Sequence, residues 1–259
     1  MAGRGLSGRI RSVVVKALFS CAAIVLFAAS AAAQNDLSAI QDNSFLVEEA
    51  YNQEDGVVQH INVFSRDQKS GDWLYTFTQE WPVGSQKHQF SYTLPVTGGT
   101  SERFGDMLLN YRYQLLGSGE TRTAIAPRVS IIVPTGGGSS GVQAAIPLSR
   151  VLGERVAAHS NAGATWYHDS RTTDLFLGQS FIYALSSRVH LMTEATWTRS
   201  QHQTDVVVSP GLRWAYNLSG GLQIVPGVAV PIGVGPSAGE RSLVLYLSFE
   251  HPFLRRAGR

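Results

Sequence analysis

The sequence predicts an all-β fold, an antiparallel transmembrane β-barrel of about twelve strands in a single domain. Charged residues make up 15% of the 259 residues and 44% are hydrophobic, whereas soluble proteins carry about 25% charged residues. From about Val57 onward, hydrophobic and polar residues alternate with a period of two between closely spaced turn signals. The mean hydropathy of −0.02 excludes a bundle of membrane-spanning helices, because several spans of about 20 apolar residues would raise it well above zero.

Residues 1–33 are predicted to be a signal peptide that is removed from the mature protein. An apolar stretch, Ala17–Ser30, precedes the small-residue cleavage pattern Ala31–Ala33. An uncleaved signal anchor and lipidation of Cys21 are the alternatives. The basic residues before the apolar stretch are Arg4, Arg9, Arg11 and Lys16.

Removing this segment takes away four basic residues and no acidic ones, so the formal net charge changes from +2 to −2. The remaining 259 − 33 = 226 residues contain no cysteine, which excludes disulfides and thiolate metal sites. The basic character therefore belongs to the precursor, and it predicts no nucleic-acid partner. We expect export to the bacterial outer membrane, where lipid and the barrel-assembly machinery would be partners.

Residues 34–55 are expected to form either a periplasmic N-terminal segment or a plug inside the barrel. As a plug, this acidic stretch would meet Arg112, Arg128 or Arg213. Its acidic residues are Asp36, Asp42, Glu48, Glu49, Glu54 and Asp55.

The barrel itself is predicted to span residues 56–253, followed by a basic tail at 254–259. The clearest strand, Trp73–Trp81, places four aromatic residues on one face, with Gln79 as the exception. The other predicted strands are Val57–Phe64, Lys87–Val96, Met107–Leu115, Ala124–Pro134, Val142–Leu148, Arg155–Tyr167, Leu175–Leu185, Val189–Thr198, Val206–Asn217, Leu222–Ile232 and Leu243–Phe253.

A soluble β-sandwich would show the same alternation, so the residue types on the two faces must distinguish the barrel from the sandwich. The polar face carries Thr, Ser, Gln and Asn with hardly any Lys, and the other face carries aromatic residues near strand ends. Trp73 and Trp81 would lie roughly 20 Å apart along the membrane normal, close to the apolar band of about 25 Å in such barrels. Long and short connections also alternate, as in outer-membrane barrels. These features favour the barrel, with the aromatic face turned toward lipid.

The opposite face would then line the lumen, with acidic and basic side chains mixed. This mixture argues against a strongly ion-selective pore. The charges either pair and hold a closed lumen together or line a polar passage for a small solute. The predicted lumen-lining residues are Glu80, Asn110, Arg112, Arg128, His159, Asn161, Glu194, Arg213 and Glu250.

No catalytic residue, metal ligand or cofactor is predicted. An outer-membrane lipid hydrolase would need a serine and a histidine together on the lipid-facing side. His88 and His251 share that face but lie near the periplasmic end, and Ser160 has no histidine at its depth. His190 and Glu194 could offer only two ligands on one face, which is weak evidence for a metal. We therefore expect no enzyme.

Several short motifs resemble an outer-membrane transporter family labelled "MetA-pathway of phenol degradation". The resemblance covers roughly residues 44–253 and implies a β-barrel for uptake of small organic compounds, with aromatic or hydrophobic ones as candidates. No ligand-binding residue can be carried over from the family. The segments that carry the resemblance are Gly105-Asp106, Tyr111–Tyr113, Ala126–Arg128, Val133–Gly136, Gly141–Gln143, Ile146-Pro147 and His159–Gly163.

The sequence thus favours a passive channel for small organic solutes. A structural or surface-interaction barrel with a closed lumen is the main alternative, and a lipid hydrolase is a weaker one.

Overall fold

The computed structural model describes residues 37, 40, 42–119, 121–201 and 203–253. The predicted signal peptide and the basic tail lie outside these residues. Among the described residues, no helix is long and apolar enough to cross a membrane.

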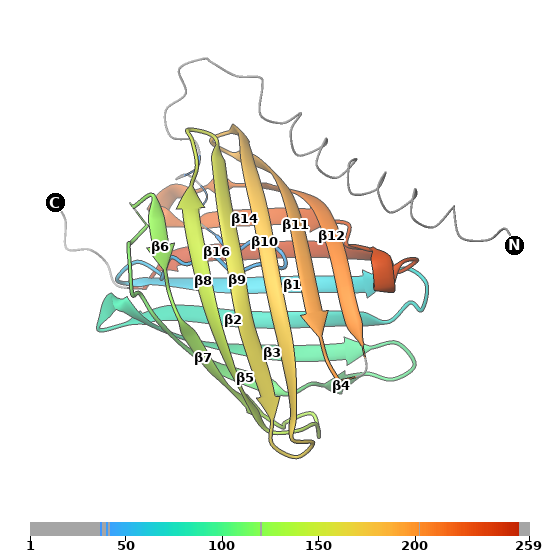
Figure 1. Cartoon of the computed structure of the whole chain (residues 1–259). Coiled ribbons are helices and arrows are strands. Elements are labelled where there is room, and N and C mark those ends of the chain that lie inside the picture. Colours follow the sequence, from blue (N-terminus) through green and yellow to red (C-terminus); the bar gives the residue numbers. More distant parts are fainter. Residues whose placement is uncertain (1–36, 38–39, 41, 120, 202, 254–259) are drawn as a thin grey trace, which may run out of the picture. The chain divides into compact units, whose positions relative to one another are not determined.

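Twelve antiparallel strands form a closed β-barrel, which confirms the predicted fold class (Figure 1). Each strand pairs with the next along the chain, and β1 pairs with β16 to close the barrel. The strands are β1 (Val57–Asp67), β2 (Trp73–Val83), β3 (Ser85–Gly98), β5 (Met107–Tyr113), β7 (Arg128–Val133), β8 (Gly141–Val151), β9 (Val156–Tyr167), β10 (Thr172–Ser186), β11 (Val189–Arg199), β12 (Thr204–Trp214), β14 (Gln223–Ala229) and β16 (Ser242–Pro252).

Short elements extend or connect these strands. They are β4 (Arg103–Phe104), β6 (Thr123–Ile125), β13 (Tyr216–Asn217), β15 (Ile232–Gly233) and the 3-10 turns η2 (Ser219–Gly221) and η3 (Gly235–Ser237). The predicted strand Ala124–Pro134 is interrupted at Ala126 and Pro127, so that β6 pairs with β8 before β7 begins. Proline explains the break, because it has no N–H to donate to a ladder. The predicted strand Leu222–Ile232 is likewise interrupted before Pro231.

The aromatic-bearing face of the strands points outward and the polar face points inward. On β2, Glu80 is buried in the interior, while its neighbour Trp81 packs on the outside against Phe90 of β3, with ring centroids 5.4 Å apart. On β7, Val129 and Ile131 are exposed while Ser130 between them is fully buried. Apolar side chains outside and polar side chains inside are the reverse of the arrangement in soluble proteins, and they are typical of a barrel whose outer surface contacts hydrocarbon.

The two ends of the barrel differ in their connections. We call the end where β1 begins and β16 ends the proximal end, and the opposite end the distal end. The distal connections are residues 68–72, 99–106, 134–140, 168–171, 200–203 and 230–241, and the proximal ones are 84, 114–127, 152–155, 187–188 and 215–222. Three proximal connections are short, as expected, whereas residues 114–127, which fold back to add β6 beside β8, and residues 215–222 are longer.

Candidate functional site

A segment without regular secondary structure, residues 42–53, lies inside the barrel. We call it the lumenal segment. Its side chains are mostly buried, and Leu46 is the exposed member. Backbone groups in such a segment have no ladder to bond with, so they need other partners. In this barrel the partners are side chains of the wall.

Glu194 of β11 and Asn161 of β9 show how the wall holds the backbone of the lumenal segment. Glu194 Oε1 accepts hydrogen bonds from the amides of Leu46 and Val47 at 2.8 and 3.1 Å. Asn161 accepts from the Glu48 amide at 2.8 Å and donates to its carbonyl at 2.9 Å. Further wall contacts follow the circumference: Ser44 with Ser180, Ala50 with Ser149, Asn52 with Gln114 and Gln53 with Gln89.

Gln59 on β1 joins the two ends of the lumenal segment. Its Nε2 donates to Asp42 Oδ1 at 2.8 Å, and its Oε1 accepts a hydrogen bond from Gln53. The Asp42 carboxylate also accepts hydrogen bonds from Tyr246 and Ser248 of β16. The segment therefore follows the inner wall around the barrel and returns to the strand from which it started.

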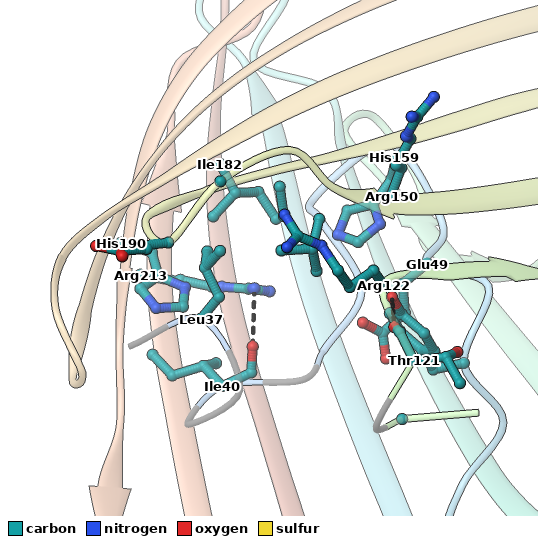
Figure 2. Close-up of a pocket in the computed structure, with 16 residues that line it drawn as sticks. Leu37, Ile40, Glu49, Thr121, Arg122, Arg150, His159, Ile182, His190 and Arg213 are labelled. Atoms are coloured by element: carbon teal, nitrogen blue, oxygen red, sulfur yellow. Dashed lines mark hydrogen bonds between the residues drawn. The ribbon is translucent and has the colours of Figure 1, made fainter. Parts of the chain in front are cut away.

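Two buried arginines hold the segment by its carbonyl groups. Arg112 donates to the carbonyls of Glu49 and Tyr51 at 3.1 and 2.7 Å, and to Asn52 Oδ1 at 2.8 Å. Arg213 donates to the carbonyls of Ile40, Asp42 and Asn43, and Figure 2 shows its contact with Ile40. A guanidinium offers five N–H donors in a fixed fork, which suits several carbonyls at once. These cations therefore bind the segment instead of facing an open passage.

Arg128 makes a different contact, an ion pair with the side chain of Glu48 at 2.9 Å. It also donates to Asn110 and Gln143 on the wall at 3.0 and 2.7 Å. Glu80 accepts a hydrogen bond from Gln89 at 2.7 Å and lies 3.9 Å from Arg112.

All nine side chains predicted to line the lumen point into the barrel. Six of them contact the lumenal segment directly: Arg112, Arg128, Asn161, Glu194, Arg213 and Glu250, the last through Gln53. His159 bonds to Ser149, which in turn contacts the segment, while Glu80 and Asn110 contact wall residues. That these nine residues line a path for a solute stays a prediction.

The sequence reasoning singled out ionic and amide groups and missed several neutral side chains that hold the segment. These residues share the inward parity of their strands, so the alternation alone was a signal that could have identified them. They are Gln59, Gln89, Ser149, Ser180, Tyr246 and Ser248.

The lumenal segment separates hollows at the two ends of the barrel. On the distal side, hollows of about 600 and 310 Å³ share Leu46, Glu48 and Arg128 in their lining. On the proximal side, hollows of about 260 and 350 Å³ share Glu49 and Tyr51. Figure 2 shows the first of these two hollows, with Glu49 in its lining. None of the residues lining the distal pair also lines the proximal pair.

Glu49 belongs to the lumenal segment and not to a strand. Burial raises the pKa of its carboxyl group to about 8, and the nearby Asp42 charge adds to this, while Arg213 and Arg112 oppose it. A buried carboxylate is costly unless it is paired, so Glu49 is a group of the segment whose protonation changes near neutral pH.

The structure contains a histidine–serine contact on the inner wall of the barrel. Ser149 Oγ lies 2.6 Å from His159 Nδ1, but it is fully buried and accepts the amide of Ala50. His88 and His251 lie on the outer face, where they pack against Tyr113 and His60. Among the described residues, no group of three or more His, Cys, Asp or Glu is placed to hold a metal ion.

No family model matches the chain, and no curated protein matches it. Solved structures do share its fold. The KdgM porin is 7% identical with a TM-score of 0.53 and aligns over 74% of this chain and 98% of its own. An outer membrane channel from Pseudomonas putida F1 is 12% identical, with a TM-score of 0.53 and coverages of 78% and 97%. The NanC porin is 11% identical, with a TM-score of 0.51 and coverages of 73% and 98%.

These similarities show that the chain has the fold of outer-membrane β-barrel channels. The finer resemblance to the phenol-degradation transporter family stays a prediction.

Proposed function

We propose that this protein is an outer-membrane channel for passive diffusion of small organic solutes, closed by its lumenal segment. The observation that carries the proposal is the way the segment is held. Side chains of the wall bind it, whereas the barrel is closed by its own backbone ladder through β1 and β16. The segment can therefore leave its place without breaking the pairing of any strand.

The cost of such a movement is spread over many separate contacts. Each neutral hydrogen bond contributes about 0.5–1.5 kcal/mol net and each bond that involves a charged group about 1.5–3 kcal/mol, because water replaces the contact when it is lost. The lumen on both sides of the segment is already hollow, so water can reach the freed groups. A barrel filled by its own wall side chains would have no comparable movement.

The proposal also assigns the two ends of the barrel to the two sides of the outer membrane. We place the proximal end, with its mostly short connections, in the periplasm and the longer distal connections outside. Membrane lipid would cover the outer aromatic and aliphatic face, and the barrel-assembly machinery would insert the chain.

Apolar side chains inside the lumen support aromatic or hydrophobic solutes. Ile61, Met192, Val244 and Tyr246 of the wall belong to one buried hydrophobic cluster with Phe45 of the lumenal segment. When the segment moves, this apolar strip would become accessible beside the polar wall, so the lumen would suit a solute with both kinds of surface.

Single-channel recording in planar bilayers tests the proposal. We expect rare, small openings for the protein lacking residues 1–33, and sustained conductance after further deletion of residues 37–55. Circular dichroism should show the same β-sheet content for both proteins. If neither protein conducts, the barrel is closed by design and serves a structural or surface-interaction role, which the many contacts of the segment would then explain.

A further inference from the structure

We propose that the wall formed by β12, β14, β16 and β1 is a binding site for small aromatic carboxylates. In the closed state, Phe45 and Asp42 of the lumenal segment occupy this site in place of the ligand. The inference rests on the proposed function, because a solute reaches the site when the segment moves.

The first half of the site is a notch for a flat ring. A Cβ atom on Gly227 of β14 would lie 2.4 Å from Phe45 Cε1, and one on Gly211 of β12 would lie 2.5 Å from Cε2. Opposite edges of the phenyl ring thus rest against two glycines on paired strands. Tyr246 completes the notch with an edge contact, its ring centroid 5.4 Å from that of Phe45 at an interplanar angle of 65°.

The backbone does not require glycine at these two positions. Neither Gly211 nor Gly227 has a positive φ, and glycine inside a strand weakens the strand while it allows a close approach. The space left by the missing side chains is therefore the physical reason why glycine stands at both positions. That space has the size and shape of one aromatic ring.

The second half of the site receives a carboxylate. Gln59, Tyr246 and Ser248 all donate hydrogen bonds to the Asp42 carboxylate, and all three are almost completely buried. Arg213 lies in the same region and donates to the Asp42 carbonyl at 2.7 Å, while its Nε makes no hydrogen bond within the described part of the chain.

Tyr246 joins the two halves, because its ring contacts Phe45 and its hydroxyl contacts Asp42. When the segment leaves, water can reach these donors, but a ring without an acceptor would cover them and exclude that water, and a buried unpaired donor is costly. A carboxylate alone would leave the notch empty. A ligand that carries both groups replaces both contacts, which selects an aromatic carboxylate over either half.

Fluorine NMR of para-fluorobenzoate tests the site on the full mature chain in detergent. In the variant Asp42→Ala/Phe45→Ala, the lumenal segment no longer supplies either group. We expect saturable broadening of the probe signal, and competition by benzoate at least about tenfold stronger than by cyclohexanecarboxylate, a difference near 1.4 kcal/mol. Equal competition by the two carboxylates would overturn the ring notch.

Two wall glycines give a matched pair of further variants. Gly227→Leu fills the notch, whereas Gly178→Leu projects toward Val47, whose Cγ2 would lie 2.9 Å from a Cβ at that position. Added to the double variant, Gly227→Leu should weaken probe binding at least about tenfold, and Gly178→Leu should leave it unchanged. Equal effects of the two substitutions would contradict the assignment.

Phe45→Ala alone keeps the inference testable if the double variant does not fold. It retains Asp42, so the carboxylate position stays occupied while the notch is empty. This protein should bind fluorobenzene and exclude para-fluorobenzoate, and the reverse preference would refute the site. These measurements detect binding and not conduction, so a channel that conducts without binding the probe would overturn the ligand class and leave the channel standing.

Discussion

Replacement of Arg112 by alanine is the sharpest test of closure by the lumenal segment. Arg112 is 3% exposed and donates three hydrogen bonds to the segment, at 2.7 to 3.1 Å. A hydrogen bond from a charged group contributes about 1.5–3 kcal/mol net. Three such bonds at the lower value give about 4–5 kcal/mol, which corresponds to roughly a thousandfold shift in the ratio of closed to open channels.

Open probability in planar bilayers measures this shift directly. A second assay uses the absence of cysteine after residue 33. A single cysteine introduced by Ala50→Cys, at a position with 0% exposure, should react with a water-soluble maleimide in proportion to the open fraction. Arg112→Ala should raise both the open probability and the labelling rate.

Arg128→Ala is the matched control, because Arg128 contacts the segment through the partly exposed Glu48 side chain. The Glu48 side chain is 34% exposed, and ion pairs that water can reach contribute about 0.2–1 kcal/mol, so this variant should shift the closed-to-open ratio by less than about tenfold. An unchanged open probability in Arg112→Ala, or an equal effect in Arg128→Ala, would refute the reasoning.

Three other predictions concern single groups. Glu194→Ala removes the acceptor of two backbone amides and should raise the open probability roughly tenfold or more. Glu194→Gln keeps an acceptor oxygen and should have a smaller effect. Equal effects of the two variants would argue against these hydrogen bonds. The raised pKa of Glu49, about 8 against an ordinary 4.5, means that the closed state is progressively destabilised as pH rises between these values. Channel opening should therefore increase with pH in this window, and Glu49→Gln should abolish that part of the response; a pH response that survives the substitution would assign it to another group. Tyr92→Phe removes a hydrogen bond of 2.8 Å to Gln79 on the outer face. It should lower the free energy of unfolding from lipid vesicles, measured by urea titration, by about 1 kcal/mol. An unchanged unfolding midpoint would show that the bond does not contribute.

The alternation of residues predicts the barrel and its inward face because both depend on a period of two within each strand. Glu194 is an example: its parity alone places it in the lumen, where the structure has it. Pro127 interrupts a predicted strand because proline has no N–H to donate to the ladder, which the alternation of residues does not take into account. Gln79 departs from the aromatic pattern, and the structure supplies the reason, since the hydroxyl of Tyr92 on the neighbouring strand satisfies it.

The course of the lumenal segment could not be predicted in the same way. Residues 42–53 have no periodicity, and their partners lie far away in the sequence: Glu194 is 148 positions from Leu46, and Asn161 is 113 from Glu48. Only the closure of the barrel brings these side chains together. The acidic composition of residues 34–55 predicts contacts with lumenal arginines. However, Arg112 and Arg213 bind backbone carbonyl groups, which every residue has and which therefore leave no signal in the sequence.

The chemistry of these anchors bears on how the channel would work. A segment held mainly by ion pairs would respond strongly to salt, because exposed charges are screened. Here one partly exposed ion pair, Arg128 with Glu48, accompanies hydrogen bonds from buried neutral groups and from two arginines to carbonyls. Screening acts weakly on such contacts, whereas a solute that supplies its own acceptor can replace them one for one. In the proposed channel, these contacts therefore favour opening by ligand exchange over opening by a change in ionic strength.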